Sequence, residues 1–103
     1  MTIKKSSAVR SLEKIRGSSL TFGKMIESIR KADEILQIDL ALKMGISKAH
    51  LCDIEKGRRN VTLSRAMQFA KVLGYSQTQF AAKALEDQAR EVGLKVKVTL
   101  EAA

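Results

Sequence analysis

The sequence has no proline and no tryptophan, and aromatic residues make up only 4% of its 103 positions. A single cysteine excludes an internal disulfide, which agrees with a reducing compartment. The apolar residues are dispersed, and no run approaches the roughly 18 residues that a membrane-spanning helix needs. The N-terminus MTIKKSSAVR is basic but lacks the apolar stretch of a secretory signal. We therefore expect a cytoplasmic protein with no membrane partner.

What is present is a chain built mainly on leucine, isoleucine, valine and alanine. Hydrophobic residues make up 45% of it, which argues against disorder and is enough for one modest core. Nineteen lysines and arginines against eleven acids give a net charge of +8 and a pI near 9.9. A small domain this basic is expected to attract polyanions, most often nucleic acid. Mere solubility or an acidic protein partner is the alternative explanation of the charge.

Serine and threonine caps, apolar residues at helical spacing and glycine stops recur along the chain. They predict an all-α fold with five helices, at residues 21–33, 37–44, 47–56, 62–73 and 76–92. Met25, Met44 and Met67 fall on the apolar stripes of these helices, so we expect them to be buried. A basic segment at residues 1–20 precedes the five helices, and its apolar spacing is that of a short additional helix.

The C-terminal stretch GLKVKVTLEAA has a different period. Apolar residues alternate with Lys95, Lys97 and Thr99, which predicts a β-strand. A lone strand leaves backbone groups unpaired, and the simplest remedy is a second copy of the chain. We therefore expect a homodimer closed by strand pairing; a frayed tail, or a strand that pairs with a different partner, is the alternative. The dimerisation residues are Leu94, Val96, Val98 and Leu100.

The second and third predicted helices have the helix-turn-helix arrangement, in which a capped helix follows a short helix and a tight turn. Gly45 lies in the turn, and Ser47 is a good N-cap for the helix that follows. Leu51 and Ile54 are expected to face inward. The side chains then directed outward are Lys48, Ala49, His50 and Asp53.

The segment QIDLALKMGISKAHLCDIEKGRRN resembles the helix-turn-helix of the Xre/Cro, or phage-repressor, family. The matching residues are Gln37, Leu40-Ala41, Gly45, Ser47, Ile54-Glu55-Lys56-Gly57 and Asn60. The resemblance covers about residues 22–75. It departs at Leu36, where the family usually has a polar N-cap, and at Val61, where it commonly has proline. We divide the chain into the basic segment 1–20, a helix-turn-helix domain at 21–75, and a C-terminal helix and dimerisation strand at 76–103.

The resemblance implies that the third helix reads DNA from the major groove. Lys48 would donate to guanine, and Ala49 would touch a thymine methyl group. His50 would donate to a base acceptor or to a phosphate, while Asp53 would accept from cytosine.

Other residues would contact the phosphate backbone. Gln37 would contact a phosphate while bracing the recognition helix, or reach a base, and Ser47 would contact phosphate as well as cap. The loop after the recognition helix would follow the backbone through Arg58, Arg59 and Asn60. In the family a buried glutamate at the position of Glu55 tends to pair with an arginine, for which Arg30 stands at the matching position.

Other kinds of chemistry find little support. A structural zinc site needs about four cysteine and histidine ligands, and the chain has one of each, His50 and Cys52. The only histidine lies on the outward face of a short helix, which argues against a catalytic triad. A phosphate-cradling glycine loop is missing as well. We therefore expect no enzyme activity, no metal and no cofactor.

The sequence thus predicts a dimeric repressor that binds a palindromic operator in double-stranded DNA. The last helix and the strand resemble HigA/HipB-like antitoxins, which implies a toxin protein as a further partner. A prophage regulator or a restriction–modification controller is the alternative, and a protein-interaction module without DNA binding is a third.

Overall fold

The computed structural model describes residues 20–101 and contains five α-helices in that range. Their bounds are α2 Phe22–Ala32, α3 Gln37–Met44, α4 Lys48–Glu55, α5 Leu63–Leu73 and α6 Gln77–Glu91. Each of them agrees with a predicted helix to within one or two residues at either end. The short helix predicted within the basic segment 1–20 lies outside the described residues.

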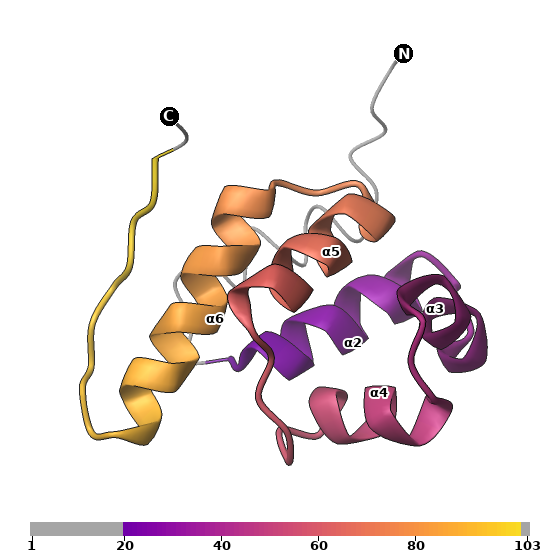
Figure 1. The fold of residues 1–103 in the computed structure, drawn as a ribbon, viewed down its shortest axis with the longest axis horizontal. Coiled ribbons are helices and arrows are strands. Elements are labelled where there is room, and N and C mark those ends of the chain that lie inside the picture. Colours follow the sequence, from indigo (N-terminus) through magenta and orange to yellow (C-terminus); the bar gives the residue numbers. More distant parts are fainter. Residues whose placement is uncertain (1–19, 102–103) are drawn as a thin grey trace.

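The helix α2 crosses the middle of the molecule (Figure 1). It contacts α4 on one side and α6 on the other, while α5 packs along α6 and also against α3. The short pair α3 and α4 therefore rests on a base formed by α2 and α5. None of the described helices is long and apolar enough to cross a bilayer.

Side-chain caps begin four of the five helices. The hydroxyl oxygens of Thr21, Ser47, Thr62 and Ser76 each accept a hydrogen bond from the backbone N–H three residues further on, at 3.0–3.2 Å. The helix α3 differs, because Leu36 stands at its N-cap and provides no side-chain hydrogen bond. The departure from the family pattern at this position thus has a structural counterpart.

The turn between α3 and α4 depends on a glycine in the left-handed region. Gly45 has a φ of 69°, which side chains with a Cβ rarely adopt. The next residue, Ile46, donates its backbone N–H to the carbonyl of Ala41 at 3.0 Å, which satisfies one of the last carbonyl groups of α3. The chain then enters α4 directly at its cap, Ser47, so the angle between the two helices is fixed by a very short connection.

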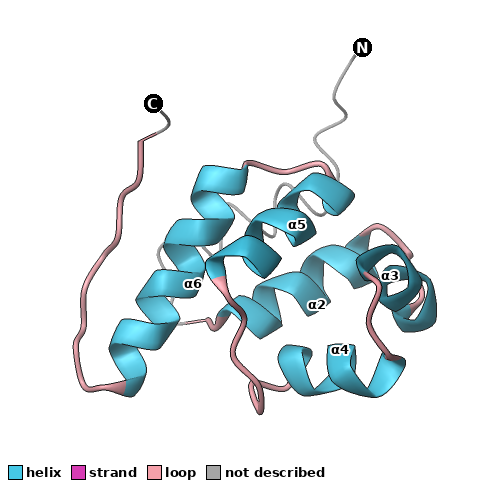
Figure 2. Ribbon diagram, in the orientation of Figure 1, coloured by secondary structure: helices cyan, strands magenta, loops and turns pink. Residues whose placement is uncertain are grey.

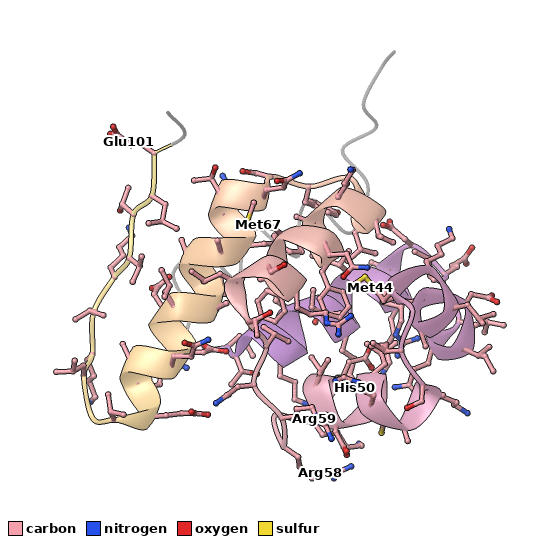
Figure 3. All side chains as sticks on the ribbon, viewed as in Figure 1. Met44, His50, Arg58, Arg59, Met67 and Glu101 are labelled. Atoms are coloured by element: carbon pink, nitrogen blue, oxygen red, sulfur yellow. The ribbon has the colours of Figure 1, made fainter. Side chains whose placement is uncertain are left out.

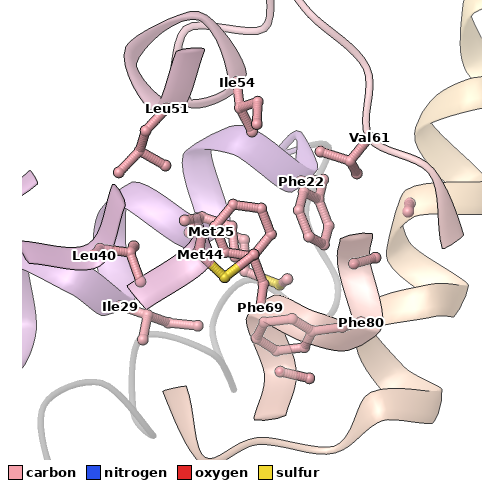
Figure 4. Packing of buried hydrophobic residues seen from close by; sticks show 14 of the residues in the cluster. Phe22, Met25, Ile29, Leu40, Met44, Leu51, Ile54, Val61, Phe69 and Phe80 are labelled. Carbon is pink, nitrogen blue, oxygen red and sulfur yellow. The ribbon is translucent and has the colours of Figure 1, made fainter. Parts of the chain in front are cut away.

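The core joins all five helices around three phenylalanine rings (Figure 4). Phe22 packs edge-on against Phe69 and Phe80, with ring centroids 5.9 Å apart in both pairs. Met25 and Met44 are buried, as predicted, but Met67 is 41% exposed, so that prediction is wrong. The core stripe of α5 is set by other residues, which are Ala66, Phe69 and Ala70.

The predicted β-strand at the C-terminus is not supported. Residues 94–101 are extended, but the part of the chain that the structure describes contains no strand (Figure 2). A strand requires backbone hydrogen bonds to a neighbouring strand, and residues 20–101 offer no second extended segment to this tail. Three of its four apolar side chains, Leu94, Val96 and Leu100, are 37–56% exposed, and Val98 is half-buried. Pairing with a second copy stays a prediction.

Candidate nucleic-acid interface

The helix α4 has an apolar inner face and a polar outer face. Leu51 and Ile54 are buried in the core. Lys48 and Ala49 are exposed, whereas His50 and Asp53 are partly exposed. The Ser47 hydroxyl at the start of the helix accepts the His50 backbone N–H at 3.0 Å. The four residues expected to face a DNA groove therefore lie on the accessible side of one helix.

A buried ion pair fixes α4 to α2. The guanidinium of Arg30 donates two hydrogen bonds to the carboxylate of Glu55, from Nε at 2.8 Å and from Nη2 at 3.1 Å. Arg30 also donates from Nη1 to the backbone carbonyl of Ile35 at 2.9 Å. The hydrogen bond to Glu55 raises the pKa of Arg30 above its ordinary value. Because Glu55 is 1% exposed, its charge is directed inward and away from any ligand of α4.

Gln37 extends this pair into a network of three helices. Its side-chain amide donates to Oε1 of Glu55 at 3.0 Å, so the first residue of α3 is attached to the last residue of α4. The expected bracing role of Gln37 therefore has a definite partner. This hydrogen bond uses the amide nitrogen of Gln37 and leaves its amide oxygen out.

Gly23 of α2 also fixes the position of α4, although it was not among the predicted functional residues. A Cβ atom added at Gly23 would lie 2.0 Å from the carbonyl oxygen of Ile54 and 2.9 Å from that of Glu55. Both obstacles are backbone atoms, so a side-chain rotation cannot make room. The absence of a side chain at Gly23 lets α2 approach the C-terminal end of α4 closely. A glycine in the first turn of a predicted helix, where it lowers helix stability, was the available signal.

The loop after α4 carries a second, exposed ion pair. Arg58 donates from Nε to Oδ1 of Asp53 at 3.0 Å, with side chains 60% and 38% exposed. Both residues were expected to contact DNA separately. In this structure Asp53 instead neutralises part of the charge of Arg58, and Arg58 neutralises the acid that stands in an otherwise basic face.

The same loop is attached to α6 further along. The side-chain amide of Asn60 donates to Glu91 at 2.8 Å, and that of Gln88 donates to the carbonyl of Val61 at 2.9 Å. Asn60 therefore has a protein partner in the free protein, and its phosphate contact stays a prediction. Arg59 is exposed beside it and lies on the same side of the molecule as His50 and Arg58 (Figure 3).

Two residues of α5 that the sequence analysis did not single out support the turn. Arg65 and Gln68 both donate to the backbone carbonyl of Met44, the last residue of α3, at 3.2 and 3.3 Å. Arg65 also adds positive charge near α4. Burial lowers the pKa of His50 below its ordinary value, and the charges of Arg59 and Arg65 lower it further. His50 is therefore mainly neutral at pH 7.

Metal chemistry finds no site in residues 20–101, where no three side chains of histidine, cysteine, aspartate or glutamate gather in a way that could hold an ion. Cys52 is a partly buried thiol on α4.

Comparisons with known proteins agree with this geometry. The helix-turn-helix family model matches residues 26–76. Among curated proteins, the chain is similar to the immunity repressor protein of Bacillus phage phi105, with 40% identity over 55 residues. The match covers 53% of this chain and 38% of that relative, so the chain spans well under half of the relative's length. No solved structure matches the chain. Residues 26–76 therefore form a helix-turn-helix domain of the Xre/Cro type.

Proposed function

We propose that the chain is a sequence-specific DNA-binding transcriptional repressor in which α4 enters the major groove. The observation that carries the proposal is the contrast between the two faces of α4. Its inner face is held by a buried network that includes Arg30, Gln37 and Glu55, while its outer face offers polar and small side chains. A rigidly mounted helix with a free polar face is what base recognition requires.

The proposed base contacts are those that the side-chain chemistry allows. Lys48 can donate to guanine O6 and N7, and Ala49 can meet a thymine methyl group. His50 can donate to a base acceptor or a phosphate. Asp53 is paired with Arg58 in the free protein, so it would accept from cytosine only if that pair opens or is shared.

The proposed phosphate contacts surround this face. Arg58 and Arg59 project from the loop after α4, and Ser47 and Gln37 lie at the N-terminal ends of α4 and α3. Asn60 completes the set only if it leaves Glu91. Contacts of this kind supply most of the affinity through release of counterions from the DNA, which suits a net charge of +8.

A homodimer on a palindromic operator is part of the proposal. One α4 helix covers only one half-site, and two copies would read half-sites about 34 Å apart, one turn of the double helix. The exposed apolar side chains of the C-terminal segment (residues 94–101) are the surface proposed to join the copies.

The similarity to a phage immunity repressor favours a regulator of the phage type over the alternatives. A repressing antitoxin that also binds a toxin is the second candidate, and it rests on the C-terminal helix and tail. The identity of the neighbouring gene distinguishes the two candidates. A gene for a small basic protein of about 100 residues favours the antitoxin, whereas phage or methyltransferase genes favour a prophage regulator or a restriction–modification controller.

DNA binding is tested by measuring the affinity for the DNA upstream of the gene at several salt concentrations. A repressor should show a steep fall in log affinity with log salt, with a slope of about 0.9 for each phosphate contacted. An unrelated fragment of the same length serves as control. A flat slope would leave only a protein-interaction module, whereas a steep slope with equal affinity for both fragments would show DNA binding without sequence preference and overturn the proposed specificity.

A further inference from the structure

Lys83 is a buried lysine of α6 without an ion pair or hydrogen bond among residues 20–101. It is 9% exposed, a degree of burial that lysine rarely reaches without a partner. Glu86 and Asp87 follow it on the same helix, but neither forms a salt bridge with it. Asp87 is engaged elsewhere, since it accepts the backbone N–H of Phe22 and lies 3.7 Å from Arg90. Asp87 attracts Lys83 electrostatically but does not reach ion-pair distance, so this buried positive charge lacks a direct ionic partner among residues 20–101.

This lysine lines a groove of about 250 Å³ between α6 and the C-terminal segment. The apolar side chains of the groove come from three parts of the chain, and they include Met25, Phe80, Val98 and Leu100. Lys97 stands on the wall together with Lys83, while Glu86 is the acid that lines it. The groove thus combines apolar and polar lining, and its two lysines outnumber its one acid, which suits a ligand that has both apolar groups and a carboxylate.

The C-terminal segment forms one wall of the groove, and its extended backbone favours a ligand that is extended as well. Residues 95–101 are extended beside α6 (Figure 1), and their backbone groups form no hydrogen bond with other described parts of the chain. Such an edge can bind a second extended peptide through backbone hydrogen bonds, while side chains at alternate positions enter pockets. A compact anionic molecule could pair with Lys83, but it could not form the row of backbone hydrogen bonds that this edge offers.

We propose that the groove binds an extended peptide of a partner protein, in which an acidic side chain meets Lys83 between apolar neighbours. The tail of a second copy fits the groove poorly, because its Lys95 and Lys97 would bring more positive charge to Lys83. An extended segment has two edges, so pairing of two tails along one edge leaves the other for this peptide. In Figure 1 the tail lies on the far side of α6 from α4, so the peptide and a ligand of α4 have separate surfaces.

The test uses the full chain and three labelled peptides, VEVEVEV, VQVQVQV and VKVKVKV, with binding followed by fluorescence anisotropy. The glutamate peptide should bind about tenfold tighter than the glutamine peptide, as expected for one charge-assisted contact. Lys83→Met keeps the length and apolar character of the side chain, and it should reduce this preference to about one. Lys95→Met, on the exposed part of the tail, is the matched control and should retain the preference.

Unchanged helical circular dichroism must accompany each variant, and Lys83→Glu gives a second readout. That variant should favour the lysine peptide over the glutamate peptide. Equal affinities for all three peptides, or a preference that survives Lys83→Met, would overturn the proposal. It would also fail if the peptide LKVKVTLE from the tail displaced VEVEVEV, because a second copy would then occupy the groove. The outcome does not depend on whether α4 binds DNA.

Discussion

The guanidinium of Arg30 and the carboxylate of Glu55 meet side by side in the interior, through hydrogen bonds of 2.8 and 3.1 Å, and so join α2 to α4. Both residues are at least nine-tenths buried. A pair of this kind adds little to stability by itself, because both charges lose their hydration, but it specifies one orientation of the helices. The loss of one partner is therefore expected to be far more harmful than the loss of both.

Arg30→Met should lower the free energy of unfolding by about 3–5 kcal/mol, because Glu55 would stay buried without its cation. Urea denaturation measures the change. The double variant Arg30→Met/Glu55→Met should lose less than Arg30→Met alone. Arg58→Met, which breaks the exposed pair with Asp53, is the control and should cost about 1 kcal/mol or less. A double variant as unstable as the sum of the single ones would show that the two residues act independently.

Gly23→Ala should destabilise the protein even though alanine favours helices by about 1 kcal/mol over glycine. The added Cβ would meet the carbonyl oxygen of Ile54 at 2.0 Å, so α2 and α4 must move apart. Thermal unfolding followed by circular dichroism measures the loss. Lys24→Ala, on the exposed side of the same turn, should change the melting temperature little. An equal or higher melting temperature for Gly23→Ala would contradict the close approach.

Substitutions of Lys48 and Arg58 should separate base recognition from phosphate binding. Lys48→Ala should relax the preference for one base position by about 1–3 kcal/mol, whereas Arg58→Ala should weaken binding to all sequences alike. Competition binding with operator variants measures both effects. Lys71→Ala, at the far end of α5 from Arg65, removes the same charge and should leave preference and affinity nearly unchanged. A uniform loss for Lys48→Ala would assign this residue to the backbone.

DNA affinity should increase as the pH falls toward 5.5. The pKa of His50 is below its ordinary value in the free protein, so the imidazole is neutral at pH 7. A nearby phosphate would favour the charged form and raise this pKa in the complex, so protonation and DNA binding strengthen each other. Measurement of affinity between about pH 5.5 and 8 at constant salt tests this. His50→Gln should flatten the profile; a profile that is the same in both proteins would place His50 outside the contact.

If the tail joins two copies as proposed, removal of residues 94–103 should give a monomer without unfolding the helices. Among residues 94–101, the one backbone contact with the helices runs from the Leu94 N–H to the carbonyl of Ala89, so a chain that ends at Gly93 keeps its core intact. Sedimentation equilibrium measures the mass, and circular dichroism checks the helices. A truncated protein that remains dimeric would refute dimerisation by the tail and move the interface to a helix surface.

The sequence was sufficient for features that depend on local chemistry. Caps such as Ser47, the glycine turn at Gly45 and the inward stripe of α4 each follow from neighbouring residues, and all were predicted. Among features that depend on how distant segments meet, the pair of Arg30 and Glu55 was predicted from the family resemblance, but others were not. The approach of Gly23 to Ile54 and the bonds from Arg65 and Gln68 to Met44 join separate helices, and nothing in the local pattern indicates these partners.

The C-terminal tail and the Asp53–Arg58 pair also depend on contacts that the local sequence pattern does not specify. Alternation of apolar residues predicts an extended backbone, and residues 94–101 are extended, but a strand also needs a neighbour that the alternation does not specify. Asp53 and Arg58 were predicted to have separate roles because one lies on α4 and the other in the loop after it. Their positions in the sequence do not indicate the hydrogen bond of 3.0 Å between Arg58 Nε and Asp53 Oδ1.

The network of Arg30, Gln37 and Glu55 has a consequence for how the DNA target of such a protein can evolve. Every hydrogen bond that mounts α4 comes from residues that face the interior or the neighbouring helices. The outward residues Lys48 and Ala49 make none of them. Sequence preference can therefore change through substitutions at the outward positions of α4, while the buried network keeps the orientation of the helix.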